Sequence, residues 1–285
     1  MRLAMFTRNG KKGIAAAENG AFFGITEDMP GYPGDIDSLL AAGKDLKTVG
    51  QTLLTGQETD LAACAFLPPV SRPSKIICVG LNYADHSKEI GFDVPAYPTI
   101  FCRFPSSLVG HGQPMIKPAQ SDQFDYEGEM VVVLKKRGKK ISESNALEYV
   151  AGYSIFNEGS IRDFQFLTPQ WTVGKNFDGT GAFGPWLVTP DSLPAGGRGL
   201  KIATRLNGQT VQESNTDNMI FSVASLIALL SDTMTLEAGD VIVTGTPSGV
   251  GVSRKPPLFM KDGDVAEVEV ESIGVLRNPV KAAQE

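Results

Sequence analysis

The sequence predicts an α+β protein built predominantly of β-strands, and two observations carry this prediction. The 285 residues include 31 glycines and 18 prolines, about 17% of the chain against an average near 12%, which indicates many turns between short strands. Apolar residues recur at helical spacing in one long segment, from Asn218 to about Ser231. These residues are Ile220, Val223, Ile227 and Leu230.

Residues 1–72 are predicted to form a small N-terminal α/β domain. Strands and turns come first, and two short helices follow over Ile36–Ala42 and Asp45–Thr55, with an aspartate at the start of each as a plausible cap. Three prolines in the segment 67–73 form a stiff connector. We place a boundary there, so residues 73–285 are predicted to form the main domain.

The main domain is predicted to hold many short strands and few helices. A short helix is expected over Asn82–Gly91, and Asn207-Gly208 signals a hairpin turn. The predicted strands are Lys75–Gly80, Phe124–Leu134, Val150–Asn157, Lys201–Leu206, Gln209–Glu213, Val241–Val243, Val265–Glu271 and Val275–Val280.

Composition excludes several classes of function. The net charge is −6 and the pI about 5.1, without the basic footprint of a nucleic-acid-binding protein. We expect a cytoplasmic protein, because the N-terminus lacks a secretory signal and no apolar run is long enough to cross a membrane. Three widely spaced cysteines favour reduced thiols. With only two histidines, a metal site rich in His or Cys is nearly excluded, whereas a site made of oxygen ligands is not.

Two glutamates in the predicted strand Phe124–Leu134 are candidates for such a site. Glu127 and Glu129 would share one face, roughly 7 Å apart along the strand. Carboxylates this close repel each other unless a proton or a cation lies between them, and Mg²⁺ takes such ligands. The alternative is an exposed acidic strand edge, but Val131 and Val133 continue the same face.

Three other segments carry candidate residues. Glu158 ends an apolar strand and is either a third acid or a surface carboxylate. His86 and Glu89 are three residues apart on a predicted helix, so their side chains would be neighbours. They could form a catalytic pair that accepts a proton, or a pair with a structural role only. The glycine-rich segment Thr244–Gly251 follows a buried strand and lacks the Lys-Ser/Thr ending of a P-loop. It favours carboxylate binding or simple turn geometry.

Taken together, these segments resemble the fumarylacetoacetate hydrolase family. The resemblance covers about residues 73–281, and residues 1–72 resemble the variable N-terminal region of many bacterial members. It lies in an ordered series of short motifs rather than in one signature. The series is Cys78–His86, Phe124–Glu129, Gly152–Glu158, Arg162–Gln165, Gly174-Lys175, Gly239–Ile242 and Thr244–Gly251.

The resemblance implies a fold, a cofactor and site residues. The implied fold is a mixed β-roll or β-sandwich with short helices, usually in a homodimer. The implied cofactor is Mg²⁺ or Mn²⁺, held by Glu127, Glu129 and Glu158, where Glu158 replaces the family's usual aspartate. His86 and Glu89 match the catalytic dyad, and Lys175 matches a lysine that faces the substrate. The positions that match substrate contacts are Arg103, Gln165 and Thr246.

The implied reaction is metal-dependent hydrolysis of a C–C bond in a 2,4-dioxo acid of the acylpyruvate type. Its products are a pyruvate and a second carboxylic acid. The alternative is an isomerase, tautomerase or decarboxylase of 2-oxo or hydroxy-diene diacids, such as intermediates of aromatic catabolism, because these reactions share a stabilised enolate. A catalytically silent member is a third reading. Phe92, Phe164, Phe166 and Trp171 either line the pocket for the distal group or belong to the core, and we favour the core for most.

Overall fold

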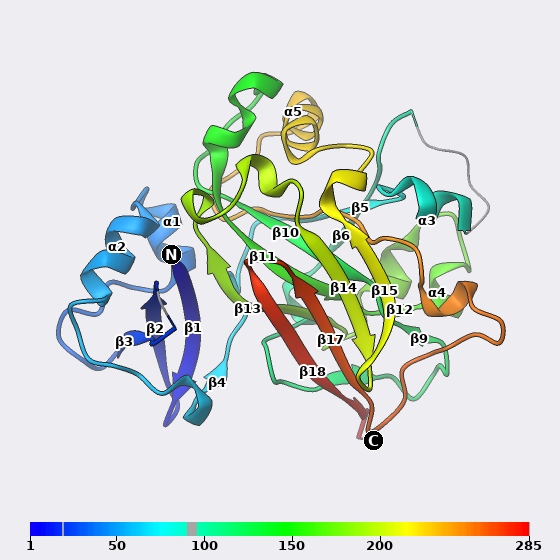
Figure 1. Ribbon diagram of the computed structural model, residues 1–285, viewed down its shortest axis with the longest axis horizontal. Helices are drawn as coiled ribbons and strands as arrows, with labels where there is room; N and C mark the ends of the chain where they lie inside the picture. The colour runs from blue at the N-terminus through cyan, green and yellow to red at the C-terminus, as the bar shows by residue number, and fades with distance from the viewer. Residues whose placement is uncertain (19, 90–95, 285) are drawn as a thin grey trace.

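The computed structural model describes residues 1–18, 20–89 and 96–284, although the side chains of residues 86–88 lie outside this description. Strands dominate and the helices are short, so the predicted α+β fold with a preponderance of β-strands is confirmed (Figure 1). Within the described part, the strands form one large sheet, a five-stranded sheet and a separate two-stranded pair.

The large sheet runs through the molecule in the order β3-β2-β1-β13-β11-β10-β16-β5-β6, with β4 paired to β1 and β7 paired to β13. Strand β10 lies in the interior of this sheet, where it pairs with β11 on one side and β16 on the other. The strands are β1 (Arg2–Arg8), β2 (Lys11–Ala17), β3 (Phe23–Thr26), β4 (Ala65–Phe66), β5 (Ile76–Gly80), β6 (Thr99–Arg103), β7 (Leu108–Val109), β10 (Gly128–Leu134), β11 (Val150–Glu158), β13 (Gly181–Val188) and β16 (Val241–Val243).

The five-stranded sheet has the order β15-β14-β17-β18-β8 and packs across the large sheet. The predicted hairpin between its first two strands is present, with positive φ angles of 52° at Asn207 and 79° at Gly208. Its strands are β8 (Met115–Lys117), β14 (Lys201–Leu206), β15 (Gln209–Asn215), β17 (Val265–Val270) and β18 (Gly274–Ala282).

The helices lie at the edges of the sheets (Figure 1). They are α1 (Ile36–Ala41), α2 (Leu46–Leu53), α3 (Ala84–Glu89), α4 (Arg162–Gln165) and α5 (Val223–Thr233). The long helix predicted from Asn218 begins five residues later. Ser222 caps it by accepting a hydrogen bond from the Ser225 N–H, and the residues 216–218 form a separate 3₁₀ turn.

The strand predicted over Phe124–Leu134 is interrupted in the structure. It divides into β9 (Phe124–Asp125), which pairs with β12 (Ser160–Ile161), and β10, which pairs within the large sheet. Tyr126 and Glu127 lie between the two strands. Glu127 therefore lies in the short irregular segment that connects β9 to β10, and not in a regular strand.

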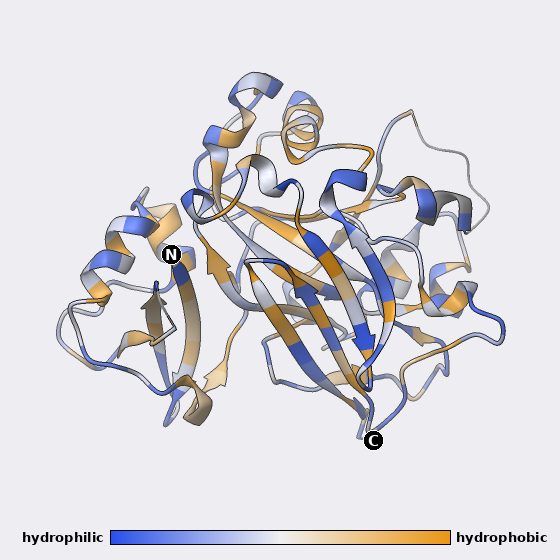
Figure 2. Ribbon diagram, viewed as in Figure 1, coloured by the Kyte–Doolittle hydropathy of each residue, from blue (hydrophilic) through white to orange (hydrophobic). Residues whose placement is uncertain are grey.

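Strand β10 is buried on both faces. Val131 and Val133 pack into an apolar core that includes α1, α2 and the first strands, whereas Met130, Val132 and Leu134 pack into the core beneath the five-stranded sheet. Figure 2 shows β10 largely in hydrophobic colours, while the strands of the five-stranded sheet and the helices α1 and α2 carry both hydrophobic and hydrophilic residues. The face that continues to Glu129 is thus a buried one, as the valines predict.

The N-terminal part shares the large sheet with the main part. Strand β1 pairs with β13 through Arg2–Val188 and Leu3–Leu187. The division into domains at residue 72 therefore stays a prediction. Among the helices of the described residues, none is long and apolar enough to cross a membrane.

Candidate active site

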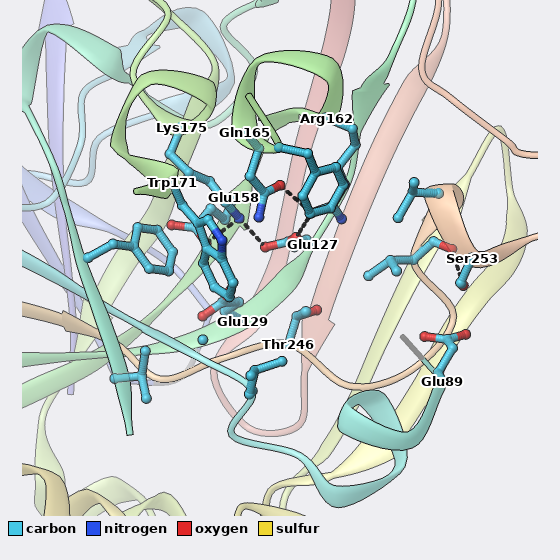
Figure 3. A pocket seen from close by; sticks show the side chains of 17 residues that line it. Glu89, Glu127, Glu129, Glu158, Arg162, Gln165, Trp171, Lys175, Thr246 and Ser253 are labelled. Carbon is cyan, nitrogen blue, oxygen red and sulfur yellow. Dashed lines mark hydrogen bonds and ion pairs between the residues drawn. The ribbon is translucent and has the colours of Figure 1, made fainter. Parts of the chain in front are cut away.

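A pocket of about 470 Å³ opens where the end of β11, the start of β10, α4 and the glycine-rich segment after β16 meet (Figure 3). Most of the predicted site residues line it. The polar lining side chains are Glu89, Glu127, Glu129, Glu158, Arg162, Gln165, Lys175, Thr246 and Ser253.

Three carboxylates converge at the floor of this pocket. One carboxylate oxygen from each of Glu127, Glu129 and Glu158 lies within 4.8 Å of the other two. The exposed fractions are 4%, 1% and 1%, respectively. Glu129 belongs to β10 and Glu158 ends the neighbouring β11. The backbone fixes Glu127 between them, because its N–H donates to Asn157 Oδ1 at 3.1 Å and its carbonyl accepts from Glu158 N–H at 2.8 Å.

Two buried cations partly balance these acids. Lys175 Nζ lies 2.7 Å from Glu127 Oε2 and 3.0 Å from Glu158 Oε2. The guanidinium of Arg162 donates through NH1 to Glu127 Oε1 at 2.7 Å. Figure 3 shows Lys175 and Arg162 approaching Glu127 from its two sides. Both oxygens of Glu127 are thus oriented before any ligand arrives.

The electrostatics of the floor suit a cation. Burial, followed by the neighbouring Glu158 and Glu127, raises the pKa of Glu129 well above its ordinary value. Burial opposes the charge of Lys175, but the two carboxylates it contacts outweigh that effect and raise its pKa. Oε1 of Glu158 is buried without a hydrogen-bond partner. A buried carboxylate oxygen that accepts no hydrogen bond, beside two other acids, fits a hard divalent cation such as Mg²⁺ or Mn²⁺.

The glycine-rich segment closes one side of the floor. The Gly245 N–H donates to Glu129 Oε2, and the hydroxyl of Thr246 donates to the Gly128 carbonyl at 3.0 Å. Gly245 has a φ of +102°, and a Cβ there would lie 2.9 Å from the Val79 carbonyl oxygen, so a side chain would be strained. The segment therefore orients a carboxylate of the site, whereas binding of a substrate carboxylate by the segment stays a prediction.

The predicted dyad is placed only in part. Both carboxylate oxygens of Glu89 lie 3.0 Å from the Gly249 N–H, and Glu89 lines the mouth of the pocket. His86 lies in α3, one turn before Glu89, but its side chain is outside the described residues.

The two remaining predicted substrate contacts differ in position. Gln165 lines the pocket and accepts from Arg162 NH1 through Oε1 at 2.8 Å. Arg103 instead lies behind the floor, where its guanidinium donates to the Gly159 carbonyl at 3.1 Å and to Thr180 Oγ1 at 2.8 Å. Its NH1 is 3.9 Å from Glu158 Oε1, so it faces the acid triad rather than the cavity.

Comparison with known proteins decides the family. The family model for the fumarylacetoacetate (FAA) hydrolase C-terminal domain matches residues 75–281. The chain belongs to the fumarylacetoacetate hydrolase family. The match covers the whole segment on which the resemblance of the motifs rests.

Relatives in this family have several activities. A human protein named oxaloacetate tautomerase FAHD2A, mitochondrial, is 42% identical over 272 residues, which are 94% of this chain and 86% of the relative. A solved fumarylacetoacetate hydrolase from Exiguobacterium antarcticum superposes with a TM-score of 0.85 at 36% identity, covering 99% of this chain and 100% of that one. The 5-carboxymethyl-2-hydroxymuconate delta-isomerase from Mycobacterium smegmatis has a TM-score of 0.78 at 31% identity, with complete coverage of both chains.

Sequence reasoning missed parts of this family member's pocket. Trp171 lines the pocket and packs edge-on against Phe101 at 5.6 Å, although the core was favoured for most of the four aromatic residues considered. Phe166 also lines the pocket and is 58% exposed. Phe164 packs against the core as favoured, and Phe92 lies outside the described residues. Arg162 lies in one of the family-like motifs, but only the tertiary contacts show that its guanidinium orients Glu127.

Proposed function

We propose that this protein is a divalent-metal-dependent enzyme that acts on 2-oxo carboxylic acids through an enolate, with keto–enol tautomerisation of an oxaloacetate-type diacid as its main reaction. The observation that carries the proposal is the buried triad of Glu127, Glu129 and Glu158 with Lys175 against it. The tautomerase named above, which aligns with 94% of this chain, supports tautomerisation over hydrolysis.

The residues present would divide the chemistry as follows. The three glutamates would hold Mg²⁺ or Mn²⁺, which supplies a Lewis acid for the oxygens of a 2-oxo acid. Lys175 presents a fixed positive charge next to the site where negative charge develops on the enolate oxygen. Gln165 uses its Oε1 to accept from Arg162, so its amide N–H groups are the donors that remain for a substrate oxygen.

Tautomerisation also needs a base for the proton on the carbon between the carbonyl groups. Glu89 is the described carboxylate at the pocket mouth, and α3 carries His86 in the preceding turn. We assign the proton transfer to this pair, as the resemblance implies. His86→Ala should then keep metal affinity and lose turnover, and an unchanged rate in this variant would show that the base is another group.

Hydrolysis of an acylpyruvate-type C–C bond is the second candidate function. It is favoured by the apolar part of the pocket wall, which can accommodate the acyl group of such a substrate. That part consists of Val79, Leu81, Phe101, Phe166, Trp171, Val250 and Val252. In this reaction the pair of His86 and Glu89 would activate water instead of removing a proton from carbon.

A substrate panel tests the proposal. Oxaloacetate enol, acetylpyruvate and a 2-hydroxy-2,4-dienoate are each incubated with Mg²⁺, with Mn²⁺ and with EDTA. Enol absorbance, pyruvate release and CO₂ release distinguish tautomerisation, hydrolysis and decarboxylation. We expect metal-dependent loss of the enol of oxaloacetate as the fastest reaction.

Two variants give the controls for this panel. Glu129→Gln should abolish the metal-dependent rate, whereas Glu148→Gln, on the exposed surface, should leave it unchanged. Turnover that EDTA does not affect, or turnover of none of the substrates, would overturn the proposed function. Faster hydrolysis of acetylpyruvate than tautomerisation of oxaloacetate would make the second candidate the main activity. We also propose that the enzyme works as a homodimer, which light scattering of the purified protein would check.

A further inference from the structure

A fourth buried acid lies directly beside the site. Asp125, at the end of β9, has no exposed surface. Its carboxylate accepts from Arg162 Nε at 2.8 Å, from the Gly251 N–H at 2.7 Å and from the Val252 N–H at 2.9 Å. One side chain thus contacts both α4 and the segment after β16, which are far apart in the sequence.

On the side of α4, Asp125 acts through the guanidinium of Arg162. While Nε of Arg162 donates to Asp125, its NH1 donates to Glu127 Oε1 at 2.7 Å. Figure 3 shows this contact between Arg162 and Glu127. Because a guanidinium is planar and rigid, fixing one edge of it on Asp125 fixes the edge that orients Glu127.

On the other side, Asp125 anchors a wall of the pocket. The two backbone donors begin the short 3₁₀ helix η8 (Gly251–Ser253), and Val250, Val252 and Ser253 line the cavity. The fit is tight, because a Cβ at residue 251 would lie 2.5 Å from Asp125 Oδ1 and 1.9 Å from the Leu258 carbonyl oxygen. The carboxylate therefore occupies the space that a glycine leaves free.

Asp125 also sets the charge of the buried cluster. Seven ionisable side chains, each at most 4% exposed, lie in and around the floor of the pocket. They are Asp125, Glu127, Glu129, Glu158, Arg103, Arg162 and Lys175. With all seven ionised, as binding of a cation requires, they total −1, and without the charge of Asp125 the total is zero.

We propose that Asp125 is a positioning residue that sets two parts of the site at once: Glu127, through Arg162, and the pocket wall of residues 250–253, through backbone hydrogen bonds. The first part rests on the proposed metal-dependent function, whereas the second does not. Asp125 itself is not among the residues that line the pocket.

The test compares Asp125→Asn with Asp240→Asn in the full chain. Asp240 is a suitable control, because it is also fully buried and accepts from two backbone N–H groups and one cationic side chain, whereas Asp125 accepts in addition from the Tyr126 N–H at 2.8 Å. Its donors are Lys75 N–H at 3.0 Å, Glu237 N–H at 2.7 Å and Lys75 Nζ at 2.8 Å. Both variants remove one buried negative charge of a hydrogen-bonded ion pair, but only one of these lies beside the site.

Three measurements are made on each variant: the Kd for Mn²⁺ by calorimetry, amide hydrogen exchange of residues 249–253, and kcat and KM with oxaloacetate. We expect both variants to lower Tm. Only Asp125→Asn should weaken Mn²⁺ binding, by about ten- to a hundred-fold as for residues that orient metal ligands. It should also speed exchange of the Gly251 and Val252 amides and raise KM.

The outcomes separate the inference from the proposed function. If Asp125→Asn matches Asp240→Asn in all three measurements, the positioning role is wrong. If the wild type binds no Mn²⁺, the proposed function and the link to Glu127 both fail, while hydrogen exchange still decides whether Asp125 holds the wall. If Asp125→Asn does not fold, Asp125→Glu replaces it. This variant keeps the charge but displaces the carboxylate, so exchange at 249–253 should rise, and unchanged exchange would overturn the inference.

Discussion

Neutralising Lys175 should move metal affinity and catalysis in opposite directions. In Lys175→Met the side chain keeps a similar length but loses its charge. The ammonium lies 2.7 Å from Glu127 Oε2 and 3.0 Å from Glu158 Oε2, two of the oxygens that are available to a cation. The positive charge of Lys175 therefore repels a bound metal cation, although it stabilises the carboxylates when no metal is bound.

The size of this opposition follows from the distances. Mg²⁺ binds oxygen at about 2.1 Å, which would place it and the ammonium about 4 Å apart. A single and a double charge at about 4 Å repel by about 2 kcal/mol in a water-like dielectric and by about 8 kcal/mol at an effective dielectric constant of about 20. The lower figure already corresponds to roughly a thirty-fold change in Kd. Part of the gain is offset, because carboxylates without Lys175 retain protons more strongly.

We therefore expect Lys175→Met to bind Mn²⁺ at least ten-fold more tightly than the wild type in calorimetry, while kcat falls by about a hundred-fold or more through loss of enolate stabilisation. Lys75→Met is the matched control, because Lys75 also pairs with a buried acid, Asp240, at 2.8 Å, but away from the pocket. Its Mn²⁺ affinity should match that of the wild type. Equal or weaker Mn²⁺ binding by Lys175→Met would refute the reasoning and show that Lys175 is needed to hold the carboxylates together.

Three further predictions concern other parts of the molecule. The raised pKa of Glu129 means that a proton must leave before a cation binds, so Mn²⁺ affinity should increase with pH. Calorimetry in two buffers of different ionisation enthalpy should detect this proton release. An affinity independent of pH would contradict the prediction. Gly80→Ala should lower kcat/KM by about ten-fold or more, because the new Cβ would lie 2.4 Å from Trp171 Cζ3 and displace the indole ring by about 1 Å. Unchanged kinetics and unchanged tryptophan fluorescence would exclude a role for the pocket wall formed by Trp171. Asp45 caps α2, because its side chain accepts a hydrogen bond from the Thr48 N–H. Asp45→Ala should therefore reduce the free energy of unfolding in urea by about 1 kcal/mol and leave the activity unchanged. A changed kcat would show that α2 affects the site.

Much of the site could be predicted because its chemistry is local in sequence. Glu127 and Glu129 are two residues apart, and the valines that follow them indicate a buried face. The strand end at Glu158 indicated a possible third acid, and the resemblance assigned it to the metal and added Lys175. The structure brings both residues to the same floor. Arg103 shows the limit of matching positions, since its side chain turns behind Glu158 to bond with the Gly159 carbonyl.

The remainder depends on contacts between distant segments. The break between β9 and β10 arises because β9 pairs with β12 instead of continuing in the large sheet, and no strand pattern within residues 124–134 encodes that choice. The roles of Asp125 and Arg162 follow from the same pairing, because it places α4 directly beside the acid. Likewise, the sequence is compatible with Trp171 in the core or at the pocket, and only its packing over Gly80 places it on a pocket wall.

The two-sided burial of β10 has a consequence for how this enzyme can vary. Val131 and Val133 share their core with residues of the N-terminal part, among them Leu3, Ile14 and Leu39. Glu129 lies on the same face of the same strand, one step further along. A substitution in the first seventy residues that shifts this core can therefore tilt a carboxylate that it never touches. Such substitutions are therefore candidate modifiers of metal affinity. Exchanging the N-terminal part between homologues should change the metal affinity of the site as well as the stability of the protein.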